Sequence, residues 1–141
     1  MSEYLLNVIV LAELFILSLI DVRHKYVNIP IVMFGCMSVI IVRVLYHLDF
    51  RDVFTGVIVG FLVLAAAKLT DQAIGYGDGI VLMFIGSALG FSKVLTIFII
   101  GLFLVSVAGL FFIALGRANR KSQWPMIPWL LVSFVIGVGI W

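Results

Sequence analysis

Two aspartates at the limits of apolar segments are the residues of this sequence best placed for chemistry. Asp21 closes the first apolar segment and Asp78 opens the fourth. Two carboxyl groups held together cannot both ionise, so the ionised one can activate a water molecule while the other donates its proton to a carbonyl oxygen. Aspartic proteases hydrolyse peptide bonds in this way, and we interpret Asp21 and Asp78 as a candidate pair of that kind.

Three glycines surround the second acid, in the segment Gly75-Tyr76-Gly77-Asp78-Gly79. Glycine lets a backbone bend and approach another chain closely, which suits a loop that positions an acid. The N-terminus of the helix that follows favours a negative charge, whereas burial opposes it. Taken alone, the segment fits equally well a plain turn in which Asp78 is a helix N-cap.

The other ionisable residues offer no competing catalytic set. His24 lies in a basic loop and His47 at the far end of the second segment, so we expect both at the membrane interface. The single cysteine, Cys36, can form neither an internal disulfide nor a zinc site by itself. Glu13 lies about 12 Å along a helix from Asp21, too far to share its proton, and we expect a buried structural acid. We expect no metal and no cofactor.

The composition places these acids in a membrane protein. Of 141 residues, 65% are hydrophobic and 11% are charged, with a mean hydropathy of +1.32, which excludes an ordinary water-soluble globule. The net charge of +2 is too small to indicate nucleic-acid binding. At ~20 residues per span the length leaves no room for a separate soluble domain. We therefore expect one all-α transmembrane domain over residues 1–141.

Breaks in the apolar pattern predict a bundle of six transmembrane helices, roughly over residues 4–20, 29–48, 53–67, 73–90, 94–115 and 125–141. The pairs Gly56/Gly60 and Gly86/Gly90 have the GxxxG spacing that lets two helix backbones approach closely. Arg43, inside the second span, is expected to extend its side chain to the membrane interface.

The distribution of Lys and Arg predicts the orientation, because cytoplasmic loops carry an excess of both. With the N-terminus outside, three basic residues fall on the outer side, and six fall on the inner side, namely Arg23, Lys25, Lys68, Arg117, Arg120 and Lys121. We therefore expect both termini outside. Asp21 and Asp78 would then meet at the cytoplasmic face.

Asp21 at the end of a helix, a basic loop closed by Ile29-Pro30, and Gly75-Tyr76-Gly77-Asp78 entering the fourth helix together resemble the type IV prepilin peptidases. These are GxGD-type membrane aspartyl proteases related to the archaeal preflagellin peptidases. The resemblance extends over essentially the whole chain and fits the short branch, which lacks the cysteine-rich insert and the methylase activity of the long enzymes. Two departures are Asn28, which precedes Ile29-Pro30 instead of following it, and Ile80 in place of a common lysine.

The resemblance implies an endopeptidase of the cytoplasmic (inner) membrane that needs no cofactor. Such enzymes cleave the short basic leader of prepilins and pilin-like precursors at the cytoplasmic face, just before the hydrophobic helix of the substrate. It also implies that Asp21 and Asp78 are the catalytic pair and that Gly75, Tyr76 and Gly77 form the active-site loop. The departures at Asn28 and Ile80 bear on substrate preference.

A proton-coupled transporter or a noncatalytic membrane subunit is the competing hypothesis. In that case Glu13, Asp21 and Asp78 would form a proton relay. Relays distribute acids through the depth of the membrane, whereas Asp21 and Asp78 are expected level at one face. Close approach of the two carboxyl groups beside an open surface would favour proteolysis, and an enclosed polar path would favour transport.

Overall fold

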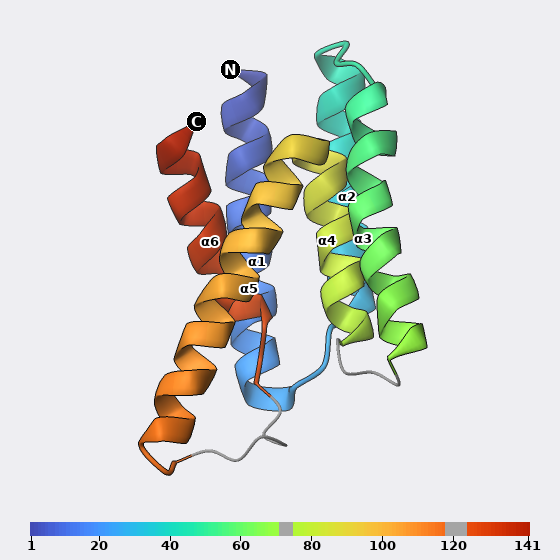
Figure 1. Ribbon diagram of the computed structural model, residues 1–141. Coiled ribbons are helices and arrows are strands. Elements are labelled where there is room, and N and C mark those ends of the chain that lie inside the picture. The colour runs from blue at the N-terminus through green and yellow to red at the C-terminus, as the bar shows by residue number, and fades with distance from the viewer. Residues whose placement is uncertain (71–74, 118–123) are drawn as a thin grey trace.

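The computed structural model describes residues 1–70, 75–117 and 124–141, and these form six helices and no strand (Figure 1). In chain order the helices are α1 (Ser2–His24), α2 (Ile29–Leu45), α3 (Arg51–Leu69), α4 (Tyr76–Leu89), α5 (Phe91–Ala114) and α6 (Ile127–Ile140). The predicted all-helical bundle is confirmed. The first two residues of the predicted fourth span, and the basic residues Arg120 and Lys121, lie outside the described part of the chain.

Three of the helices, α1, α3 and α5, are long and apolar enough to cross a membrane, at 23, 19 and 24 residues. The other three are shorter apolar helices of 17, 14 and 14 residues. A helix satisfies its backbone hydrogen bonds internally, which a segment surrounded by lipid requires. The many large apolar side chains on the outside of the bundle are what a hydrocarbon environment permits.

Both chain termini lie at the same end of the bundle (Figure 1), which we call the terminal end. The end of α1 that carries Asp21 and the start of α4 that carries Asp78 lie at the opposite end, which we call the acid end. Termini on one side are what the predicted topology requires. Which side faces the cytoplasm stays a prediction.

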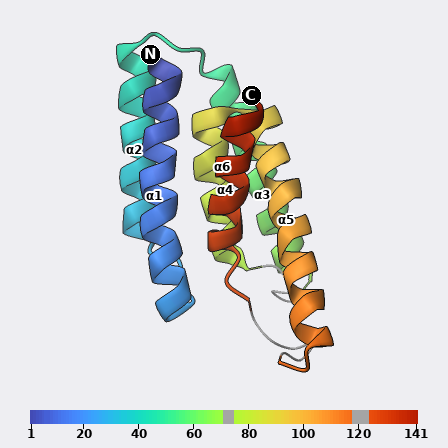
Figure 2. The ribbon, with the colours of Figure 1, turned by 90° about the vertical axis from the view of Figure 1, so that its left-hand side faces the viewer.

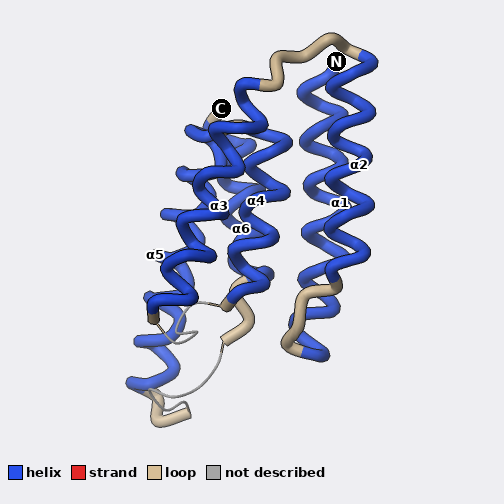
Figure 3. Tube along the Cα trace, turned by 90° about the vertical axis from the view of Figure 1, so that its right-hand side faces the viewer, coloured by secondary structure: helices blue, strands red, loops and turns tan. Residues whose placement is uncertain are grey.

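The helices α1 and α2 form an antiparallel pair that stands beside the group α3 to α6 (Figures 2 and 3). The pair joins the group mainly where α1 packs against α6 and α2 packs against α4. Buried apolar side chains of α1, α4 and α6 fill the space between, among them Leu14, Leu17, Phe84, Ile85 and Phe134. This core places the last turn of α1 beside the first turns of α4 and α6.

Glycines hold α3 and α4 in close contact. Gly56 and Gly86 face each other so closely that a Cβ atom on either would collide with the carbonyl group of the other. Gly60 packs against the backbone of α4 in the same way. Gly90 has another role, because with a φ of +83° it forms the single-residue turn between α4 and α5. Three of the four GxxxG glycines therefore pack helices, as predicted.

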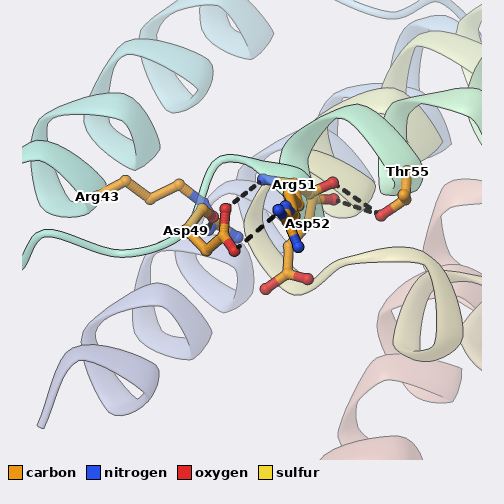
Figure 4. Close-up of polar contacts among 5 residues, drawn as sticks. All are labelled: Arg43, Asp49, Arg51, Asp52 and Thr55. Atoms are coloured by element: carbon orange, nitrogen blue, oxygen red, sulfur yellow. Dashed lines mark hydrogen bonds and ion pairs between the residues drawn. The ribbon is translucent and has the colours of Figure 1, made fainter.

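At the terminal end, Arg43 is buried, with 3% of its surface exposed. It donates hydrogen bonds to the carbonyl oxygens of Ser87 (3.1 Å) and Ala88 (3.0 Å) in the last turn of α4. It also donates to the carbonyl oxygen of Asp49 (2.6 Å), whose carboxylate accepts the N–H of Arg51 at the start of α3 (Figure 4). The prediction that Arg43 reaches the interface is wrong, because the unpaired carbonyl groups at the end of α4 provide acceptors inside the bundle.

Candidate functional site

Asp21 lies in the last turn of α1 and is buried, with 7% of its surface exposed. The N–H of Lys25 donates to the Asp21 carbonyl oxygen (2.9 Å), and Lys25 adopts a left-handed conformation (φ 55°) that ends the helix. The chain therefore turns back immediately after the acid, and the short loop to Asn28 leads into α2.

The Asp21 carboxyl group faces the start of α6. Its Oδ2 atom accepts the backbone N–H of Ile127, the first residue of that helix, at 3.4 Å. A helix N-terminus carries unpaired N–H groups and a partial positive charge, so it favours an anion at this position. Sequence reasoning missed this contact. The available signal was the pair of prolines, Pro125 and Pro128, at the start of the last span.

Asp78 lies in the first turn of α4 and is half-buried. Its N–H donates to the carbonyl oxygen of Gly75 (3.2 Å), which is the N-cap residue of the helix. The carboxyl group folds back toward the same residue, so that Oδ2 lies only 3.0 Å from where a Cβ atom of residue 75 would be. The alternative that Asp78 is itself the N-cap is therefore wrong. The acid occupies the third helical position, where a carboxylate faces the free N–H groups of its own helix.

The structure brings the two acids together. Helices α1 and α4 pack against each other, and Val27, six residues after Asp21, contacts Gly77, the residue before Asp78. Each carboxyl group also lies at the N-terminus of a helix, α6 for Asp21 and α4 for Asp78. Gly75 and Tyr76 are exposed beside them. The pair is thus positioned inside the acid end of the bundle but next to its surface.

The glycines around Asp78 are required by close packing. A Cβ atom at Gly77 would collide with the side chain of Val27, in the loop between α1 and α2. A Cβ atom at Gly79 would lie 2.6 Å from the side chain of Leu64 on α3. These contacts fix the start of α4 against the loop that follows Asp21 on one side and against α3 on the other.

Sequence comparison adds a second finding to the two acids at one end of the bundle. The profile of the type IV leader peptidase family matches residues 8–141. The chain belongs to this family. Comparisons with curated proteins and with solved structures gave no significant match. The resemblance drawn from Asp21, the basic loop and the Gly75 to Asp78 segment is confirmed, and the protein is a protease of the leader peptidase type.

In the described part of the chain, the side chains of the remaining ionisable residues form no hydrogen bond or ion pair with the two acids. His24 is exposed and stacks near Tyr26, with ring centroids 5.6 Å apart, and His47 lies in the loop between α2 and α3. Glu13 is buried, as predicted, and packs against Gly35 of α2. Among the described residues, no three His, Cys, Asp or Glu side chains come together as metal ligands.

The two departures from the common family pattern have different surroundings. Asn28 is the N-cap residue of α2, in an extended conformation, and it is half-buried. Ile80 lies in the second turn of α4 and packs against the hydrophobic core. Both side chains are partly buried, and Asn28 also lines a groove between α1 and α2.

Proposed function

We propose that this peptidase is a membrane aspartyl endopeptidase that removes the short basic leader of prepilin or pilin-like precursors at the cytoplasmic membrane face. One observation supports the mechanism above all others. Two aspartates that are far apart in the sequence lie at the same end of the bundle. Asp21 is at the end of α1 and Asp78 is at the start of α4. Family membership supplies the reaction class.

The pair hydrolyses a peptide bond in two stages, each with proton transfers to and from the carboxyl groups. The ionised carboxylate takes a proton from water as the oxygen attacks the carbonyl carbon, while the protonated carboxyl donates its proton to the carbonyl oxygen. The tetrahedral intermediate then collapses and the C–N bond breaks. The leaving amine takes the proton that the first carboxylate gained from water, and a hydroxyl proton of the intermediate returns to the other carboxylate, which restores the pair. The two acids titrate as a unit, so the roles belong to the pair. The helix N-termini at both carboxyl groups stabilise the negative charge that the pair carries.

The transporter hypothesis receives less support from the same residues. A relay needs polar groups connected through the membrane depth. Glu13, the acid at intermediate depth on α1, lies beside a groove with mostly apolar walls and packs against α2, away from α4. The arrangement therefore favours an acid pair at one face.

The chemistry is tested by replacing each acid with its amide. Asp21→Asn and Asp78→Asn should each reduce cleavage of a precursor by about 1,000-fold or more, and the double variant should be scarcely worse, because residues that act as one unit are strongly non-additive. Glu3→Gln is the matched control, since Glu3 is an exposed acid (80%) at the terminal end. Rates are compared at equal amounts of membrane-inserted protein. Full cleavage by folded Asp78→Asn protein would contradict the proposal.

The orientation is tested by cysteine accessibility in a Cys36→Ala background. Arg23→Cys, just after Asp21, should react with an impermeant thiol reagent only from the cytoplasmic side. Arg51→Cys, at the other end and with 91% of its side chain exposed, should react only from outside. The opposite pattern would place the acid pair on the outer face and contradict cytoplasmic cleavage.

A further inference from the structure

A groove between α1 and α2 lies outside the acid pair and has no role in the mechanism above. Its volume is about 590 Å³. Its walls are mostly apolar, with Ala12 and Ile16 on α1 and Phe34 on α2, and Asn28 lies at one end. Phe34 is 72% exposed and Ile16 46%, so the groove opens to the outside of the bundle, on the helix pair that stands beside the other four helices (Figure 2).

One polar side chain belongs to this apolar groove. Glu13 lines it, is only 6% exposed, and has a carboxyl oxygen, Oε2, that is buried without a hydrogen-bond partner. Gly35 makes room for this carboxyl group, because a Cβ atom there would collide with it. A polar group left unpaired in an apolar medium is costly, and lipid acyl chains offer neither donor nor acceptor. The geometry indicates an occupant that carries its own polar group.

One end of the groove lies near the loop that contacts the start of α4. Asn28 at its end follows Val27, and Val27 contacts Gly77, next to Asp78. At the other limit, Glu13 lies eight residues before Asp21 on the same helix, which is about 12 Å at 1.5 Å per residue. A chain that leaves the acid pair past Val27 therefore reaches the Asn28 end of the groove.

We propose that this groove receives the apolar transmembrane helix of the precursor, on the C-terminal side of the bond to be cleaved, and that the Glu13 carboxyl group forms a hydrogen bond with a polar group of that helix. This inference rests on the proposed function. A groove of this volume holds a row of side chains and not a whole helix, so the substrate helix lies on α1 and α2 with one face inserted.

The geometry also gives the register of recognition. The distance of about 12 Å from Asp21 to Glu13 corresponds to about eight residues of a helix or about four of an extended chain. The partner of Glu13 therefore lies about four to eight residues after the cleaved bond. Glu13 is a specificity-determining residue that contacts the substrate, and it takes no part in the proton transfers.

The first test uses two substrates, a full precursor in membranes and a soluble peptide that spans only the cleavage site. Ala12→Trp fills the groove and should raise KM for the full precursor about tenfold, which corresponds to about 1.4 kcal/mol. It should leave kcat/KM for the short peptide unchanged. Ala114→Trp, at the exposed end of α5, is the matched control and should alter neither. An equal effect of Ala12→Trp on both substrates would overturn the inference.

The polar contact is tested by two replacements of Glu13. Glu13→Leu should raise KM for the full precursor about tenfold, whereas Glu13→Gln keeps a hydrogen-bonding group and should recover most of the affinity. Neither change should affect the short peptide. The polar residues of the precursor helix are replaced by alanine one at a time. For one of them, four to eight positions after the cleaved bond, Glu13→Leu should cause no further rise in KM. Equal behaviour of Leu and Gln would overturn the role of Glu13.

A direct contact measurement does not depend on how the tryptophan variant folds. A benzophenone amino acid replaces Phe34 in the groove or, as the control, Phe61 on α3, which is 62% exposed. Illumination of the Asp78→Asn protein with the precursor should cross-link position 34 to the substrate helix and position 61 only to lipid. Lipid adducts alone at position 34, with normal cleavage by the unmodified protein, would overturn the groove and leave the peptidase assignment intact. Absence of cleavage by the unmodified protein would overturn both.

Discussion

The two ends of α4 are both polar, but they are built in opposite ways. At the terminal end, the last carbonyl groups of the helix accept hydrogen bonds from Arg43, which is almost fully buried. At the acid end, Asp78 occupies the first turn, half-buried, beside the exposed residues Gly75 and Tyr76. A second acid, Asp21, lies at the same end of the bundle, in the last turn of α1. At the terminal end a positively charged group is paired with hydrogen-bond acceptors. At the acid end two groups that can both carry a negative charge lie at the same site.

This difference separates a structural use of polar groups from a chemical one. A buried arginine bound to three carbonyl oxygens connects α2, α4 and the loop before α3, so it holds the fold together. Two carboxyl groups at one site repel each other unless one of them is protonated, so their proximity stores no stability. Such an arrangement is what the proposed mechanism requires.

The largest expected effect on stability is at the terminal end. Arg43→Met keeps the apolar stem of the side chain but leaves the carbonyl groups of Ser87, Ala88 and Asp49 without their donor. Hydrogen bonds of a charged group contribute about 1.5–3 kcal/mol each, and relief of the buried charge offsets part of the loss. We expect the free energy of unfolding in detergent to fall by about 3 kcal/mol, measured by denaturant titration followed by circular dichroism.

The control for this change is another arginine of the same region. Arg51 is exposed over 91% of its side chain, and its ion pair with Asp49 is long, at 3.9 Å. Arg51→Met should alter stability by less than about 1 kcal/mol, as is usual for exposed pairs. Equal losses for the two variants would mean that the buried network does not hold the end of α4.

At the acid end we expect the opposite pattern, a loss of activity with little loss of stability. Gly77→Ala places a methyl group against Val27, so the start of α4 or the loop must shift. A displacement of about 1 Å in a catalytic group can cost about 100-fold in rate. We expect kcat/KM to fall by about that factor while the unfolding midpoint changes little.

A second substitution distinguishes this steric cause from any other effect of alanine. Val27→Ala removes the methyl groups that the new side chain would meet, so the double variant should recover much of the lost activity. A double variant as inactive as Gly77→Ala would mean that the contact between α4 and the loop does not position Asp78.

Much of this comparison could be predicted from the sequence. The helices follow from apolar segments and their breaks, and the meeting of Asp21 with Asp78 follows from counting spans, since a first span ends where a fourth begins. Gly56 and Gly60 are identified by spacing alone. These features depend on local pattern and on the alternation of direction, both of which one sequence contains.

What the sequence could not predict are contacts between groups distant in the chain. Arg43 was expected at the interface because isolated arginines in spans usually reach it, but the open end of α4 lies beside it only in the folded bundle. The Ile127 N–H that faces Asp21 is a backbone group, so the identity of the residue does not reveal the contact. The pairing of Glu13 with Gly35 across α1 and α2 depends on the rotation of both helices about their axes.

The smallest expected effect concerns how firmly α4 is held between its two ends. At Gly56, a Cβ atom would meet the backbone of Gly86, which cannot yield as a flexible side chain would. Gly56→Ala must therefore separate α3 from α4 locally, and overpacking of this kind costs about 1–3 kcal/mol. The matched control is Gly109→Ala on α5, where an added Cβ has nothing within 4 Å and alanine is the better helix former. We expect the first variant to lower the unfolding free energy by about 2 kcal/mol and the second to leave it unchanged or raise it slightly. If the activity of Gly56→Ala fell by more than the loss of folded protein explains, the spacing of α3 and α4 would affect the position of the acid pair. The two ends of α4 would then not be independent.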